Sequence, residues 1–226
     1  MGRMAGNPWQ DAKRKMEYLQ ARYASVSPCR FYDEILGHIE DEPDFQLCAM
    51  HAQAKKGQRM RRYDDVMDML LDAGARRDAY VYPAAYYHSY ALEVLMQSTS
   101  CLYIDLDHVA AKQLRRFCDA DFFGHRPTYL VNSGNGVHLV YVLQEPVQTY
   151  NWAKKLLKRI HRALLTVFRQ HHFDADLKTG ISHAYRIVGS LTKLGQVCRA
   201  YWVGGCMTIE ALTRSVGVTW ARPQKP

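Results

Sequence analysis

A β-hairpin is the feature of this sequence that most constrains its fold. Residues 127–143 read PTYLVNSGNGVHLVYVL, in which two runs of β-favouring residues flank a turn that contains glycine and asparagine. This arrangement is typical of two antiparallel strands joined by a short turn. Further extended segments are expected at 101–109, 183–193 and 196–205.

Helical patterns alternate with these strands. An apolar stripe marks residues 151–171 as the clearest helix: Trp152, Leu156, Ile160, Leu164 and Val167. Shorter helices are expected at 8–24, 63–74 and 112–123. In the first of these, Lys13, Arg14 and Lys15 are expected to lie mostly on the outer side. Strands mixed with helices predict one α/β or α+β unit.

The composition allows one hydrophobic core and favours a polyanionic partner. The chain has 226 residues, 48% of them hydrophobic, and a formal charge of +8. No apolar run could span a bilayer and the first residues lack the apolar core of a signal peptide, so a cytoplasmic protein is expected. Six cysteines without a C-x-x-C pair fit free thiols, although Cys198 and Cys206 could share a metal ion or a disulfide.

Two aspartates end the segment 101–109, which reads CLYIDLDHV. In a strand, residues two apart point to the same face, so Asp105 and Asp107 would lie side by side. Their carboxylates would repel each other unless a cation lies between them, and oxygen ligands suit Mg²⁺ or Mn²⁺. For a bare D-x-D the alternative is a solvated turn after a strand.

The hairpin turn and a later segment carry phosphate-binding chemistry. Gly134 and Gly136 let the turn backbone approach a ligand, and His138 can donate a hydrogen bond to phosphate, more strongly if protonated. A single strand histidine is equally explained as a packing residue. The segment 174–193, DADLKTGISHAYRIVGSLTK, adds a second acid pair and then a cluster suited to a triphosphate: Asp174, Asp176, Arg186, Ser190 and Lys193.

The order of these motifs resembles the catalytic core of the archaeo-eukaryotic primase superfamily. D-x-D on a strand, S-G-x-G-x-H on a hairpin and a later Asp before R-x-x-G-S/T span about residues 80–200. The likeness is to primase-polymerase domains of plasmid and mobile-element replication proteins. It implies an α+β core with a mixed or antiparallel sheet and an RRM-like half. The sequence departs from the family's R-x-P-G-T-x-N-x-K pattern at Val188 and Ser190, and it lacks the asparagine.

The resemblance also implies roles for individual residues. Two divalent ions, Mg²⁺ or Mn²⁺, would be held by three acids: Asp105, Asp107 and Asp176. The choice of Asp176 over Asp174 rests on its spacing to Arg186 and stays open. The nucleotide would be bound by six residues: Ser133, Gly134, His138, Arg186, Ser190 and Lys193. The expected partners are single-stranded DNA, nucleoside triphosphates and a downstream helicase or replication domain.

A basic tract precedes this core. KKGQRMRR, residues 55–62, has five positive charges in eight positions, and its candidate template contacts are Lys55, Lys56, Arg59, Arg61 and Arg62. A solvated loop explains it equally. The expected organisation is a helical and basic part at 1–78, the catalytic core at 79–215 and a basic tail at 216–226.

The sequence therefore predicts a template-directed nucleotidyltransferase, a DNA primase or primase-polymerase. One alternative is a primase-like domain that binds single-stranded DNA without polymerising. A rolling-circle nicking enzyme needs two histidines around one apolar residue, whereas GVHLVYV has one. A metal-dependent phosphatase or nuclease would explain the acids and leave the hairpin motif unexplained.

Overall fold

One antiparallel sheet organises the chain. The computed structural model describes residues 7–39, 45–53, 57–73, 76–87 and 91–219. Within them, ten strands form a sheet in the order β1-β10-β6-β7-β5-β4-β2-β3, with β8 paired to β5 and β9 paired to β4. The strands are β1 (Ser25–Val26), β2 (Phe45–Gln53), β3 (Gly57–Tyr63), β4 (Ala79–Tyr87), β5 (Met96–Asp107), β6 (Tyr129–Asn132), β7 (Val137–Gln148), β8 (Asp174–Ala175), β9 (Tyr185–Arg186) and β10 (Arg199–Trp202).

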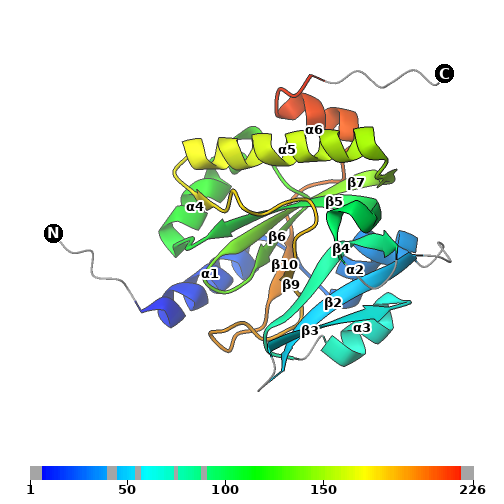
Figure 1. Ribbon diagram of the computed structural model, residues 1–226. Helices are drawn as coiled ribbons and strands as arrows, with labels where there is room; N and C mark the ends of the chain where they lie inside the picture. Colours follow the sequence, from blue (N-terminus) through cyan, green and yellow to red (C-terminus); the bar gives the residue numbers. More distant parts are fainter. Residues whose placement is uncertain (1–6, 40–44, 54–56, 74–75, 88–90, 220–226) are drawn as a thin grey trace.

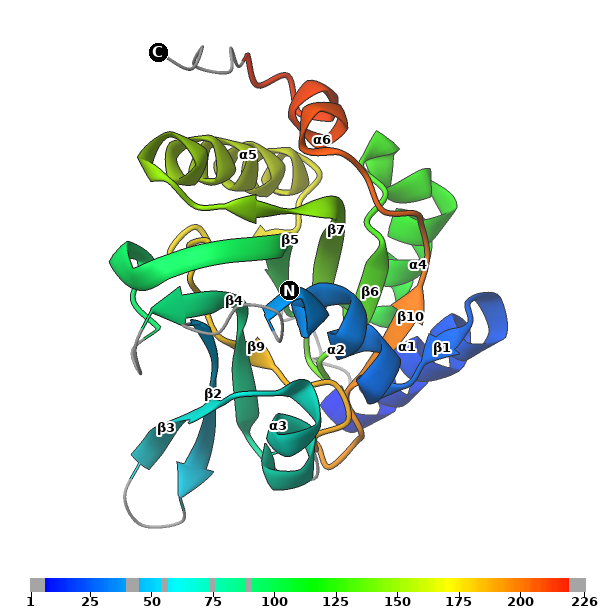
Figure 2. The same ribbon diagram turned by 90° about the vertical axis from the view of Figure 1, so that its right-hand side faces the viewer.

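Helices cover both faces of this sheet (Figures 1 and 2). They are α1 (Pro8–Arg22), α2 (Pro28–Leu36), α3 (Val66–Ala73), α4 (Ala111–Asp119), α5 (Asn151–Gln170) and α6 (Ile209–Ser215). One core packs α4, α5 and α6 onto one face of the central strands, and a second core packs α2 and α3 onto the other. The Ser27-Pro28 pair starts the second helix, because Ser27 Oγ accepts a hydrogen bond from Arg30 N (3.3 Å) and Pro28 is its first residue.

The long strands β5 and β7 form the centre of the sheet. Alternate residues of β5 face the two cores: Leu102, Ile104 and Leu106 contribute to the α5 side, and Tyr103 contributes to the α2 side. Asp105 and Asp107 share the face of Tyr103 by this alternation. They lie at the end of that face, where the strand leaves the core.

Most expected elements match the structure, with two corrections. For the basic tract 55–62, the alternative of a solvated loop is wrong from Gly57 onward, because these residues form β3, an edge strand paired with β2. The expected outer position of Lys15 is wrong, because its exposed fraction is 1%. Strands β1, β2 and β3 join the N-terminal part to the same sheet as the expected catalytic core.

Two further observations concern the cysteines and the helices. All six cysteines are free thiols, so Cys198 and Cys206 do not form a disulfide. Among the described segments, no helix combines the length and the apolar character that crossing a bilayer requires.

Candidate active site

Four aspartates lie near the point where β5 ends: Asp105 and Asp107 in β5, and Asp174 and Asp176 in or next to β8. β8 pairs with β5 so that Asp174 lies opposite Asp107 and Ala175 lies opposite Leu106. Continuing this antiparallel register brings Asp176 opposite Asp105, and directly opposed residues share a face. Asp174 is turned toward solvent, where its Oδ2 lies 3.1 Å from Nδ1 of His108. Asp176 is half-buried, which makes it the better partner for Asp105.

The environment of these acids disfavours their ionised forms. Burial raises the pKa of Asp105 to about 6; His183 opposes this shift and Asp176 adds to it. Burial also raises the pKa of Asp107, with added repulsion from Asp105. Within the described part of the chain, no lysine or arginine forms an ion pair with Asp105, Asp107 or Asp176. The cluster therefore holds negative charge without a cation of its own.

His138 in β7 lies directly opposite Asp105 in the neighbouring strand β5. Its Nε2 is 3.6 Å from Oδ1 of Asp105, its Nδ1 is buried without a hydrogen-bond partner among the described residues, and its exposed fraction is 5%. Burial, with a smaller contribution from Arg186, lowers its pKa to about 3. The imidazole is therefore neutral at physiological pH, so the expected gain from a protonated His138 does not apply to the free protein.

The turn 133–136 packs against the strand that carries the acids. Gly134 has a φ of +107°, a left-handed conformation that favours glycine. A Cβ on Gly136 would lie 2.4 Å from the carbonyl oxygen of Leu106, the residue between the two aspartates. The absence of a side chain at Gly136 thus lets the turn 133–136 touch the backbone of β5 between Asp105 and Asp107.

The segment 186–193 divides into residues that line the site and residues that support it. Arg186 is buried; its guanidinium donates to Asp78, to the carbonyl of Leu191 at 3.1 Å and to the hydroxyl of Tyr80 at 3.0 Å. Ser190 lies away from the site, because its buried hydroxyl donates to the carbonyl of Ile187 (2.6 Å). Lys193 is exposed and forms no ion pair with a described residue.

These elements surround an open pocket of about 570 Å³. Its lining includes seven of the nine expected metal-binding and nucleotide-binding residues: Asp105, Asp107, Ser133, Gly134, His138, Arg186 and Lys193. Ser190 is not among the lining residues, and neither is Asp176. The expected site residues therefore lie around one cavity, although they come from segments up to 88 positions apart in the chain.

The fold can be compared with those of known proteins. No protein-family model and no curated protein matches this sequence. Among solved structures, the AEP domain of the cyanophage S-2L Primase-Polymerase (PrimPol) is similar, with a TM-score of 0.56, 14% identity, and coverage of 81% of this chain and 97% of that chain. The chain has the archaeo-eukaryotic primase fold. Two structures of primase RepB′ superimpose on it less well.

The first of these two is the catalytic domain of RepB′ in complex with initiator DNA. It has a TM-score of 0.48 and 13% identity, and the match covers 93% of both chains. The second is primase RepB′ with a TM-score of 0.46 and 15% identity, covering 93% of this chain and 62% of that one. The fold class expected from the sequence is confirmed by the likeness to the S-2L domain.

The acids of this primase fold have the chemistry to hold a divalent cation. They offer carboxylate oxygens whose mutual repulsion is not offset by an ion pair with a described lysine or arginine, and Nε2 of His138 lies 3.6 Å from Oδ1 of Asp105. In the described residues, however, no three His, Cys, Asp or Glu side chains are positioned together as a metal site. The donor atoms are of the kind that Mg²⁺ and Mn²⁺ prefer, but the described side chains are not arranged as a preformed metal site.

Sequence reasoning missed several residues of the pocket region, and three of them bear directly on the site. His183 lines the pocket and lowers the pKa of Asp105. Thr192 lines it where the expected hydroxyl, that of Ser190, does not. Lys15 donates two hydrogen bonds to the turn 133–136 from the distant helix α1. Of these three residues, only Thr192 could have been found from the sequence, because it immediately precedes Lys193, which was an expected site residue.

Three of the five candidate template contacts belong to the described residues. Lys55 and Lys56 are outside the described residues, and Arg59 lies in β3. Arg61 Nη1 is 2.8 Å from Oδ2 of Asp72, and Arg62 donates to the side chain of Gln46. Both Arg61 and Arg62 remain exposed, so these contacts leave them accessible.

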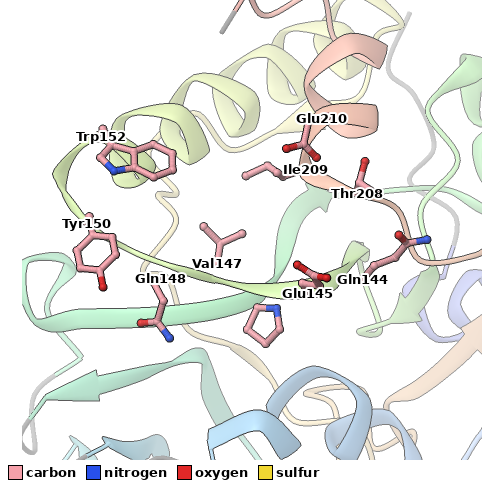
Figure 3. Close-up of a pocket in the computed structure, with 10 residues that line it drawn as sticks. Gln144, Glu145, Val147, Gln148, Tyr150, Trp152, Thr208, Ile209 and Glu210 are labelled. Carbon is pink, nitrogen blue, oxygen red and sulfur yellow. The ribbon is translucent and has the colours of Figure 1, made fainter. Parts of the chain in front are cut away.

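A second pocket lies at a different place, between β7, α5 and α6 (Figure 3). Its volume is about 390 Å³, and the side chains around it include Tyr150, Trp152, Glu145 and Glu210. None of the expected site residues lines this pocket. Its two carboxylates and its lack of lysine and arginine make it unsuited to a polyanion.

Proposed function

We propose that this chain is a template-directed nucleotidyltransferase, a DNA primase or primase-polymerase that synthesises primers on single-stranded DNA. The observation that carries the proposal is the contact of Gly136 with the backbone between Asp105 and Asp107. Because of this contact, Asp105 and Asp107 line the same pocket as the turn 133–136, to which we assign phosphate binding. The S-2L Primase-Polymerase domain, which has the same fold, supports this choice among phosphoryl-transfer reactions.

Asp105, Asp107 and Asp176 would hold two divalent ions, Mg²⁺ or Mn²⁺. Bound there, such ions would make the attacking 3′-hydroxyl more acidic and neutralise the leaving pyrophosphate. The protein's own groups would position the triphosphate. His138 would donate from its neutral imidazole to a phosphate oxygen, Lys193 would contribute a mobile positive charge, and Ser133 a hydroxyl.

Arg186 would act at the same pocket in a different way. Its guanidinium donates to Asp78, Tyr80 and the carbonyl of Leu191, so most of its donors are engaged within the protein. We infer that it shapes the segment that carries Thr192 and Lys193 and adds positive potential to the pocket. Ser190 would support the same segment from inside.

One incubation tests the proposal. The protein is mixed with unprimed single-stranded DNA, Mn²⁺ and labelled ribo- or deoxynucleotides, and dinucleotides and longer products are sought on a gel. Products should form with the wild type and be lost in Asp105→Asn/Asp107→Asn and in Asp176→Asn. Asp174→Asn is the matched control and should retain activity, because Asp174 faces solvent beside His108. If Asp174→Asn is inactive and Asp176→Asn is active, the assignment of the third acid is reversed.

The alternative is a domain that binds single-stranded DNA without polymerising. Two observations favour it: the acids do not form a metal cage among the described residues, and Arg186 is engaged within the protein. Extension of a supplied primer, without synthesis on unprimed template, would retain polymerase activity and exclude priming. No product in either assay, together with retained DNA binding, would establish the binding domain.

A further inference from the structure

Lys15 is a buried ammonium group beneath the glycine turn. It lies in the middle of α1, and its Nζ donates to the carbonyl oxygens of Gly134 (2.7 Å) and Asn135 (2.9 Å). Burying a lysine is costly unless it is paired, and burial lowers the pKa of Lys15 to about 8 despite the favourable charge of Asp11. A surface position would avoid this cost, so the contact with the turn is the feature that needs explanation.

The two hydrogen bonds fix the orientation of two peptide groups. The described chain contains no cis peptide bond, and in a trans peptide the N–H points opposite to the carbonyl. The N–H groups of Asn135 and Gly136 therefore point away from Lys15. Neither N–H has a backbone partner among the described residues, although both residues line the pocket. Successive unpartnered N–H groups in a turn with a left-handed residue form an anion-binding concavity.

The same face of α1 also contacts α4, the helix that follows Asp105 and Asp107 in the chain. Asp11, one helical turn before Lys15, accepts hydrogen bonds from the N–H of Ala111 at 3.1 and 3.2 Å. Ala111 is the first residue of α4, which begins four residues after Asp107. Asp11 thus caps α4, and Lys15 fixes the turn 133–136. Helix α1 therefore links the segment that follows the acids to the glycine turn.

We propose that Lys15 is a positioning residue that holds the turn 133–136 with its N–H groups available to the phosphates of an incoming nucleoside triphosphate. This inference rests on the proposed function for the identity of the ligand. The ammonium group also adds a fixed positive charge below the turn. Lys15 contacts the protein backbone, so it acts through the turn and does not touch the nucleotide.

The first test measures the turn without any ligand. Lys15→Met keeps the apolar stem and removes the donors. Amide hydrogen exchange should become at least about 10-fold faster at Gly134, whose N–H donates to Oδ1 of Asn132, and at Val137 and His138, which follow the turn in β7. Lys13→Met is the matched control, because Lys13 lies on the exposed side of the same helix. Unchanged exchange in Lys15→Met, measured where the variant is folded by its melting curve, would overturn the proposal.

The second test measures nucleotide binding and turnover with Mn²⁺ and either ATP or dATP. Lys15→Met should raise the dissociation constant and KM about 10-fold or more, with a smaller change in kcat and wild-type affinity for single-stranded DNA. Lys15→Arg, which keeps charge and donors, should restore most of the affinity. A faster-exchanging turn with unchanged nucleotide affinity would overturn the role of Lys15 in nucleotide binding.

The two tests separate this inference from the proposed function. If wild-type protein binds neither ATP nor dATP and makes no product, the proposed function fails and Lys15 is left without a nucleotide to position. If the wild type is active and Lys15→Met matches Lys13→Met in every measurement, the inference alone fails. If Lys15→Met does not fold, Lys15→Arg and Lys15→Gln are compared, and only a loss in the glutamine variant supports the proposal.

Discussion

At the scale of single residues, Gly136 is where the turn and the acid-bearing strand are in closest contact. A Cβ there would lie 2.4 Å from the carbonyl oxygen of Leu106 and 3.4 Å from the Cα of Asp107. Both atoms belong to the backbone, so a larger residue must displace a whole segment and not one flexible side chain. A displaced segment would carry Asp105 and Asp107 with it.

Gly136→Ala should therefore lower nucleotide addition by at least about 100-fold, because displacements near 1 Å at a catalytic site have effects of this size. It should also destabilise the protein by about 1–3 kcal/mol through overpacking. Gly205→Ala is the control, since a Cβ at Gly205 has no atom within 4 Å. Primer extension and urea unfolding measure the two effects, and equal behaviour of both variants would contradict the expectation.

The site residues found from the sequence are those whose chemistry is local. Asp105 and Asp107 are two positions apart, and Gly134, Gly136 and His138 lie within five positions, so strand and turn geometry is enough to associate them. Lys15 forms its hydrogen bonds with residues 119 and 120 positions away, and only the fold brings them together. His138 was found, but its neutral state follows from burial, which its neighbours in sequence do not determine.

At the scale of elements, β3 and α5 present positive charge in different places. In the pairing of β4 with β2 and of β2 with β3, Ala79 lies opposite His51 and His51 lies opposite Arg59. The β2–β3 hairpin therefore begins at the end of β4 where Tyr80 accepts a hydrogen bond from Arg186. Helix α5 covers the face of the sheet opposite to the one that packs against α2 and α3. Its exposed cations are Lys155, Lys158, Arg159, Arg162 and Arg169, and it contains no acidic residue.

This arrangement predicts which cations contact the template. Arg59→Gln/Arg61→Gln/Arg62→Gln should reduce the salt dependence of single-stranded DNA binding by about two units of slope, because each phosphate contact adds about 0.7. Lys155→Gln/Arg159→Gln/Arg162→Gln removes the same charge from the other face and should leave the slope near wild type. Fluorescence anisotropy over a range of salt concentrations measures both, and the reverse result would move the template to α5.

Some of the strands that the sequence did not indicate carry little local signal. β3 reads GQRMRRY and has no regular apolar alternation, because it is an edge strand. β8 has two residues and depends on pairing with β5. By contrast, α5 and the β6–β7 hairpin each carry a long set of buried residues, and their patterns indicated them correctly.

At the scale of the whole molecule, the two cores enclose polar groups whose protonation would be costly. His161 lies in α5 against the sheet with an exposed fraction of 4%, and its Nε2 has no partner among the described residues. Burial lowers its pKa to about 4, despite an opposing interaction with the backbone of Tyr103. The folded protein therefore holds His161 neutral at pH values where the unfolded chain would protonate it.

His161 should make the protein sensitive to acid. Because its folded pKa lies below its ordinary value near 6.5, stability is lost as pH falls from about 6.5 to 4, by up to about 3 kcal/mol for this group. His161→Leu should remove that part of the pH dependence, whereas His172→Asn, at an exposed histidine beyond α5, should leave it intact. Urea unfolding between pH 4.5 and 7.5 measures the slopes, and identical slopes for His161→Leu and the wild type would contradict the assignment.

The partnership of Lys15 with the turn has a consequence for the order of events during protein synthesis. Helix α1 is made early, yet its buried ammonium meets its partners only after more than a hundred further residues have been added. Contacts of such long range close late in folding. A chain that stops before residue 133 would contain both aspartates of β5 and leave Lys15 exposed to water. Such a fragment would lack the turn 133–136 that Lys15 contacts. The pocket can therefore form only after synthesis has passed Gly136.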